Sequence, residues 1–239
     1  RALAFAKDAA GDRAGIRHCK YIRQAAQRHL DDLERQKTRS FGYYFSEEDA
    51  QSPCWFIEQL PHVEGSWATK LLRLEPSQLF ILCCVFGWRN KSDDNRRFST
   101  VYIEMARKGA KSTLSAGVAL YCLTMENEVG PQVICAATTG EQAQKVFSPA
   151  RLMVDRSPDI RDACGLEVFS KSIMSHQNGG YIQSITSKGK TQDGWNPHLA
   201  ILDELHAHPD RRLYDVIRSA FGARKNPLLW AITTAGYNM

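Results

Sequence analysis

From residue 101 to residue 233, short apolar segments alternate with longer segments of helical composition. Buried strands are predicted at Val101–Ile103, Gln132–Ala137, Leu199–Leu202 and Leu228–Thr233. Helices are predicted at Ser112–Met125, Glu141–Asp155 and Arg211–Phe221, and a hairpin around Asn178-Gly179-Gly180. Such alternation favours an α/β fold in which a mostly parallel sheet has helices on both faces.

Residues 1 to about 40 are polar and rich in Arg, Lys, Ala and Gln, and the first 75 residues predict helices without intervening strands. Helices are expected at Ile16–Gln36 and Ser46–Leu60, and a third from Ser77 to Trp88. We therefore divide the chain into an N-terminal helical segment, residues 1–75, and an α/β core, residues 76–239. A chain of 239 residues has the length for one large domain with a small appendage.

Composition excludes some classes of protein. No apolar run reaches the ~18 residues that a membrane span needs. Seven cysteines without a CxxC pair favour reduced thiols over a disulfide framework. His206 and His208 alone make a weak zinc site. The net charge of +5 is compatible with a polyanionic partner but does not identify one.

The segment from Ile103 to Thr113 follows a predicted strand and opens a predicted helix, which is the context of a phosphate-binding loop. Backbone N–H groups at such a turn bind phosphate oxygens. Lys111 is expected to reach the β- and γ-phosphates of a nucleotide, and Ser112 to bind Mg²⁺. The remaining nucleotide-binding candidates are Arg107, Lys108, Gly109, Ala110 and Thr113. The usual first and second glycines are replaced, so a basic loop that caps an ordinary helix is the alternative.

The strand predicted at Leu199–Leu202 ends in Asp203-Glu204. In a parallel sheet these acids lie at the carboxyl edge, beside the phosphate turn. Asp203 is expected to hold Mg²⁺ through water, and Glu204 to polarise the attacking water. A solvated acidic pair at a strand end is the alternative for this segment alone.

Two further segments offer polar groups to a nucleotide. Thr233 and Thr234 end the last strand, where their hydroxyls can sense the γ-phosphate and couple it to a neighbouring element; two ordinary strand-end threonines are the alternative. Gln78 precedes the phosphate turn, and its amide matches the hydrogen-bonding edge of adenine.

Together these motifs resemble the large subunit of tailed-phage terminases, the DNA-packaging motors. Arg107 to Thr113 matches that family's variant Walker A motif, in which an arginine stands four residues before the lysine. Asp203-Glu-Leu-His206 resembles its Walker B motif, Ile232 to Gly236 its coupling motif, and Leu74 to Arg89 its adenine motif. The resemblance covers nearly the whole chain and implies a RecA-like (ASCE) P-loop NTPase fold.

The resemblance implies an ATP hydrolase that uses ATP and Mg²⁺ to translocate double-stranded DNA into a procapsid in the cytoplasm of an infected cell. It implies a homo-oligomeric ring, usually a pentamer, and contact with a portal protein and a small terminase subunit. A neighbouring subunit would supply an arginine, for which Arg224 is preferred over Arg211 and Arg212. From the residues themselves, Lys188 and Lys190 form a candidate basic loop for DNA contact, with an ordinary solvated loop as the favoured alternative. Terminases also carry a C-terminal nuclease domain, so no nuclease activity is expected of this segment.

Two rival functions remain open from the sequence. A helicase or translocase of the Asp-Glu-x-His type shares the fold and the coupling strand, but needs a second RecA-like domain. A non-catalytic nucleotide- or DNA-binding module is compatible with the degenerate turn. The presence of Lys111, Ser112, Asp203 and Glu204 argues against that module.

Overall fold

The computed structural model describes residues 1–65, 70–186, 195–208 and 210–234. The chain divides into two compact units, of which the first comprises residues 1–58 and 73–98 and the second residues 59–72 and 99–239. None of the helices in the described ranges is both long and apolar enough to cross a membrane.

The first unit consists of α1 (Ala2–Gly11), α2 (Lys20–Arg35), β1 (Tyr43–Phe45), α3 (Glu47–Glu58), α4 (Pro76–Gly87) and β2 (Trp88–Asn90). The three predicted helices are present as α2, α3 and α4, whereas α1 and the antiparallel pair of β1 and β2 were not predicted. Helix α2 begins later than expected because the Asp12 carboxylate accepts the backbone N–H groups of Ile16 and Arg17 and holds them in a turn. Helix α4 packs on α1 and α3, so residues 76–98 belong to the first unit. This differs from the predicted boundary after residue 75, which assigned these residues to the α/β core.

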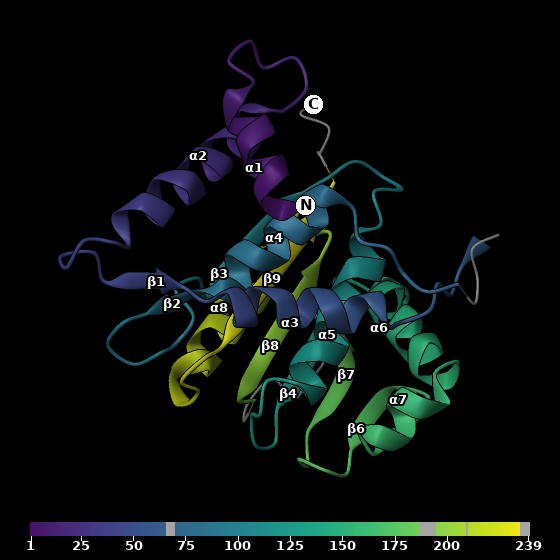
Figure 1. Ribbon diagram of the computed structural model, residues 1–239. Helices are drawn as coiled ribbons and strands as arrows, with labels where there is room; N and C mark the ends of the chain where they lie inside the picture. Colours follow the sequence, from purple (N-terminus) through teal and green to yellow (C-terminus); the bar gives the residue numbers. More distant parts are fainter. Residues whose placement is uncertain (66–69, 187–194, 209, 235–239) are drawn as a thin grey trace. The chain divides into compact units, whose positions relative to one another are not determined.

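The second unit is built on a seven-stranded sheet (Figure 1). Its strands lie in the order β3 (Thr100–Glu104), β9 (Leu228–Thr233), β8 (Pro197–Asp203), β4 (Gln132–Ala137), β7 (Tyr181–Thr186), β6 (Ser172–Ser175) and β5 (Leu166–Val168). The first five are parallel, and β6 and β5 are antiparallel. The mostly parallel sheet and the hairpin between β6 and β7 confirm the predictions.

The helices of this unit are α5 (Lys111–Thr124), α6 (Gly140–Asp155), α7 (Pro158–Ala163) and α8 (Arg212–Ala220), with short 3-10 helices η2 (Leu205–Ala207) and η3 (Phe221–Ala223). Helix α8 packs Leu213 and Ile217 against a face that includes Leu229 and Ala231 of β9. The intervening Trp230 points to the opposite face, where its indole N–H donates to Ser115 of α5 at 2.9 Å. Helices therefore cover both faces of the sheet, as predicted.

The order of the strands determines where the motifs meet. Strand β9 lies between β3 and β8, and all three run parallel. The phosphate turn follows β3, the acidic pair ends β8 and the paired threonines end β9. All three motifs consequently lie at the same carboxyl edge of the sheet.

Candidate phosphate-binding and acidic site

The turn between β3 and α5 has the geometry of a phosphate loop. Lys108 and Ala110 have φ angles of 64° and 58°, in the left-handed region. A Cβ atom on Gly109 would lie 3.1 Å from the carbonyl oxygen of Ala106 and overlap the side chain of Met105, which explains the glycine. The tight turn delivers the chain directly into the first residue of α5, Lys111.

Lys111 is buried and folds back over this turn. Its ammonium group donates to the carbonyl oxygens of Met105 at 3.1 Å and Ala106 at 3.2 Å. Ser112 and Thr113 follow in the first turn of α5 and are half-buried, whereas Arg107 and Lys108 are exposed. The turn thus combines a buried cation, a helix N-terminus and two hydroxyls, which is the donor set that a nucleotide's phosphates require.

Asp203 ends β8 and is buried, with 3% of its surface exposed. Its Oδ2 atom is buried and accepts no hydrogen bond from any described residue. Burial raises the pKa of this carboxyl above its usual value, and the charge of Glu204 raises it further. A hydrogen bond from the backbone N–H of Glu204 and the charges of Lys145 and Lys111 oppose the shift. A buried carboxylate oxygen of this kind fits a site for a bound cation, because the cation would supply the partner that Oδ2 lacks.

The raised pKa of Asp203 predicts that Asp203→Asn stabilises the protein at neutral pH. The folded chain binds the Asp203 proton more tightly than the unfolded chain does. The free energy of unfolding therefore falls as the pH rises toward the pKa of Asp203 in the folded chain and this carboxyl ionises. We expect a higher free energy of unfolding for the variant than for the native chain at pH 7, and a smaller gain at acidic pH. Urea unfolding at several pH values measures it, with the exposed Asp215→Asn as control. A variant less stable than the native chain at pH 7 would contradict the prediction.

Glu204 is held by the end of β9. Its backbone has a φ angle of 48°, a strained conformation for a residue with a side chain. Its Oε2 atom accepts hydrogen bonds from the backbone N–H of Thr234 at 3.0 Å and from the Thr234 hydroxyl at 3.1 Å. The acidic motif and the threonine motif, which are 30 residues apart in sequence, are therefore in direct contact.

His206 and Thr233 extend this network toward the phosphate turn. The Nδ1 atom of His206 lies 2.6 Å from the Thr233 hydroxyl and 3.4 Å from the Oε2 atom of Glu204. The carbonyl oxygen of Thr233 accepts the backbone N–H of Met105, at the start of the phosphate turn, at 3.1 Å. A continuous set of contacts thus joins the phosphate turn, the paired threonines and Glu204.

Gln78 lies in the first unit and has a structural partner there. Its side-chain oxygen accepts the backbone N–H of Glu75 at 2.9 Å, as part of a capping box at the start of α4. The side chain is buried, and its adenine-binding role stays a prediction. Lys188 and Lys190 lie outside the described residues.

Arg224 lies near the opposite edge of the sheet from the phosphate turn, shortly before β9 begins. Its guanidinium donates to the Glu128 carboxylate at 2.6 Å and to the carbonyl oxygens of Asn196, Val129 and Gly130. Its side chain is only 9% exposed. These contacts give Arg224 a structural role. Its action on a neighbouring subunit stays a prediction. For Arg224 to act there, these contacts would have to break.

Arg224→Met is expected to lower the free energy of unfolding by about 3 kcal/mol, because it leaves the Glu128 carboxylate without its ion-pair partner. Urea unfolding measures the change, and Arg218→Met on the exposed face of α8 is the matched control. A stably folded Arg224→Met variant that has lost ATPase activity only in assembled rings would instead favour the trans-acting role.

The other two arginine candidates are exposed. Arg211 lies 3.4 Å from Asp215, and Arg212 pairs with Asp210 at 2.6 Å. Both follow the acidic pair in sequence and have more than three quarters of their side-chain surface exposed. Their guanidinium groups are accordingly more available to another molecule than that of Arg224.

Lys145 was missed by sequence reasoning. It lies on α6, and its positive charge acts on Asp203. The sequence around Lys145 does not indicate that this residue is near Asp203, because their proximity depends on how α6 packs against the sheet.

Comparisons with known proteins agree with this geometry. Residues 76–239 match the family model described as "Terminase large subunit, ATPase domain". The chain is 31% identical over 187 residues to the terminase large subunit of Enterobacteria phage HK97, a match that covers 77% of this chain and 36% of the relative. It is 50% identical over 56 residues to protein YmfN of Escherichia coli (strain K12), covering 23% of this chain and 12% of that protein.

A solved structure shares the fold. The crystal structure of the HK97 bacteriophage large terminase superposes with a TM-score of 0.65 and 27% sequence identity, over 77% of this chain and 37% of that chain. The present chain therefore spans little more than a third of the length of this relative.

Proposed function

Because the chain belongs to the family of terminase large-subunit ATPase domains, we propose that it hydrolyses ATP to drive double-stranded DNA into a viral procapsid. The observation that carries the proposal is the convergence of three motifs at one sheet edge. The buried ammonium of Lys111, the Asp203 carboxylate with its unpartnered Oδ2 atom and the Thr234-bound carboxylate of Glu204 lie together at this edge.

Each residue has a role that follows from its position. Lys111 exchanges its carbonyl partners for the β- and γ-phosphate oxygens, and the turn's backbone N–H groups with Thr113 hold the phosphates. Arg107 and Lys108 are exposed beside the turn and add positive charge near the γ-phosphate. Glu204 orients the attacking water and accepts its proton.

Ser112 and Asp203 are the residues that would hold Mg²⁺, since they offer a hydroxyl and a buried carboxylate oxygen at this edge. Bound there, Mg²⁺ neutralises the charge that develops on the phosphate oxygens.

Thr233 and Thr234 are proposed to couple hydrolysis to movement. Thr234 binds the carboxylate that orients the water, and Thr233 contacts both His206 and the first residue of the phosphate turn. A change at the γ-phosphate would therefore alter the hydrogen bonds at the end of β9.

Thr234→Val is expected to lower kcat for ATP hydrolysis about tenfold and leave ATP binding unchanged. The substitution keeps the shape of the side chain and removes one hydrogen bond to a charged carboxylate, which is worth about 1.5 kcal/mol or more. Steady-state phosphate release measures the effect, with Thr100→Val on β3 as the matched control. A changed KM with an unchanged kcat would refute the coupling role of Thr234.

The partners are proposed from family membership. We propose that the chain acts as a homo-oligomeric ring, a pentamer, around double-stranded DNA, and docks on the portal protein with a small terminase subunit. Its place of action would be the cytoplasm of the infected host cell. The trans-acting cation would come from Arg224 or, on grounds of exposure, from Arg211 or Arg212.

The function is tested by phosphate release from Mg·ATP at high protein concentration, with and without double-stranded DNA. A packaging ATPase predicts hydrolysis that double-stranded DNA stimulates and that Glu204→Gln abolishes. Equal rates in the native chain and in Glu204→Gln would instead indicate the non-catalytic binding module. The match to the terminase family favours the packaging motor over a helicase of the Asp-Glu-x-His type.

A further inference from the structure

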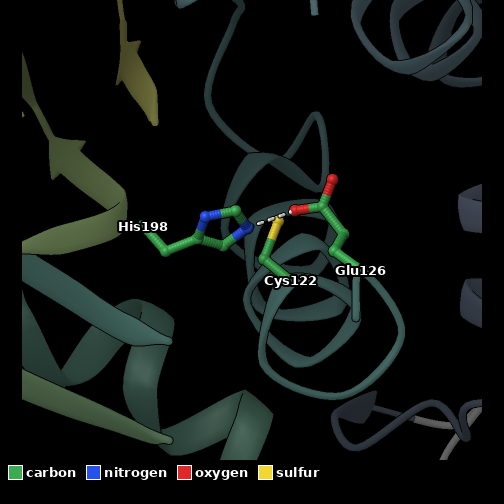
Figure 2. A group of neighbouring side chains, drawn as sticks. All are labelled: Cys122, Glu126 and His198. Atoms are coloured by element: carbon green, nitrogen blue, oxygen red, sulfur yellow. Dashed lines mark hydrogen bonds and ion pairs between the residues drawn. The ribbon is translucent and has the colours of Figure 1, made fainter. Parts of the chain in front are cut away.

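Three side chains with metal-binding atoms converge at the edge of the sheet opposite the phosphate turn. Cys122 lies near the end of α5, Glu126 follows two residues after that helix, and His198 is the second residue of β8. Their sulfur, carboxylate oxygen and imidazole nitrogen all lie within 4.8 Å of one another. Figure 2 shows the three side chains directed toward a common point. The Nε2 atom of His198 lies 2.7 Å from the Oε2 atom of Glu126.

The cluster is shielded from solvent. Cys122 and His198 are each 1% exposed, and the Glu126 side chain is 8% exposed. A buried thiol, carboxylate and imidazole supply one sulfur, one oxygen and one nitrogen ligand. This mixture suits Zn²⁺, which takes thiolate, imidazole and carboxylate ligands in tetrahedral sites. It does not suit Mg²⁺, which prefers oxygen ligands and retains its waters.

The surroundings of His198 provide a partner for its second ring nitrogen. Nδ1 is buried without a hydrogen bond to any described residue, and the Oε2 atom of Glu128 lies 3.9 Å away. If Nε2 binds a metal, the ring proton resides on Nδ1 and faces this carboxylate. Histidine ligands to metals commonly donate their other N–H to a carboxylate in this way, which fixes the ring and its tautomer.

We propose that Cys122, Glu126 and His198 form a Zn²⁺ site with three protein ligands. A Cys122 thiolate and a Glu126 carboxylate together neutralise the two charges of the ion, and a water molecule completes the tetrahedron. The thiol proton is released to solvent on binding, so the affinity for Zn²⁺ rises with pH.

The site joins the two elements that carry the catalytic motifs. Helix α5 begins at Lys111 and β8 ends at Asp203, whereas Cys122 and His198 lie at the other ends of these elements. Asp203 lies five positions after His198 along the extended strand, a distance of about 17 Å. The ion would therefore fasten α5 to β8 without taking part in phosphate chemistry.

The test is metal binding by the full chain, first with Co²⁺ as a spectroscopic substitute for Zn²⁺. The native chain is expected to bind one Co²⁺ with visible tetrahedral bands and a thiolate charge-transfer band, and Zn²⁺ to displace it and raise the Tm. Cys122→Ser should remove the charge-transfer band and lower the Zn²⁺ affinity at least about 100-fold. The half-buried Cys164→Ser is the matched thiol control and should retain both.

Glu126→Gln, which preserves side-chain volume, tests the site independently if Cys122→Ser folds poorly. It should weaken Zn²⁺ binding about 10-fold or more while leaving the thiolate band detectable at saturating Co²⁺. Absence of a charge-transfer band in the folded native chain would overturn the proposal. So would a band that survives in Cys122→Ser and disappears in Cys164→Ser.

Discussion

Glu204→Gln is expected to lower kcat for ATP hydrolysis by about 10²–10⁴-fold, while Mg·ATP binding is retained. The loss corresponds to removing a positioned general base from the attacking water. Glutamine keeps the length of the side chain and an oxygen that accepts from Thr234, so the contact between β8 and β9 can survive. Phosphate release and equilibrium binding of a fluorescent ATP analogue, measured on one preparation, separate the two effects.

The matched control is Glu167→Gln on β5, an exposed carboxylate on the strand farthest from β3 in the sheet. This control should hydrolyse ATP at the native rate. A Glu204→Gln variant with unchanged kcat would remove Glu204 from the catalytic role. Circular dichroism would show whether a variant that no longer binds nucleotide has also lost its fold. In that case Glu204→Asp would be measured in place of Glu204→Gln.

Lys111→Met is expected to lower kcat/KM by about 10²–10³-fold or more. The substitution keeps most of the aliphatic stem and removes the ammonium group, which would otherwise stabilise charge on the β- and γ-phosphate oxygens. Unlike Glu204→Gln, it should also weaken nucleotide binding, because the same group contacts the ground-state phosphates. Isothermal titration with ATP and ADP, together with hydrolysis rates, measures both consequences.

Lys171→Met, an exposed substitution between β5 and β6, controls for loss of positive charge. Removal of the Lys111 ammonium also frees the carbonyl oxygens of Met105 and Ala106, so the turn itself can relax. Native affinity for ATP in a folded Lys111→Met variant would show that the phosphates bind elsewhere.

The sequence predicted those parts of the site that depend on local pattern. A strand, a small-residue turn and a helix place Lys111 and Ser112 together within one short segment. An apolar strand that ends in acid places Asp203 and Glu204 at the carboxyl edge, because parallel strands share one polarity.

Contacts between segments that are distant in the sequence could not be predicted from local sequence patterns. The bond between Glu204 and Thr234 depends on β9 lying next to β8, and the sequence contains no marker of that pairing. The ion pair of Arg224 with Glu128 joins residues 96 apart in sequence. The cluster of Cys122 with His198 similarly lacks the short spacing by which metal sites are recognised in a sequence.

In the N-terminal unit, too, only some of the elements could be predicted from the sequence. Helices α2, α3 and α4 were predicted, α2 from its apolar periodicity and α3 and α4 from signals at their first turns. Strands β1 and β2 have only three residues each, too few for a recognisable alternation. The position of α4 beside α1 and α3 was also not predictable, because an almost wholly apolar helix gives no single face to assign.

The most direct measurement is a crystal structure of the chain with Mn²⁺ and a non-hydrolysable ATP analogue. We expect the β- and γ-phosphates to lie within hydrogen-bonding distance of Lys111 and of the turn at residues 105–110. We also expect anomalous density for Mn²⁺ at the hydroxyl of Ser112 and, through water, at Asp203. A nucleotide bound away from this turn would contradict the proposed site. So would a metal ion that contacts neither Ser112 nor a water molecule bound to Asp203.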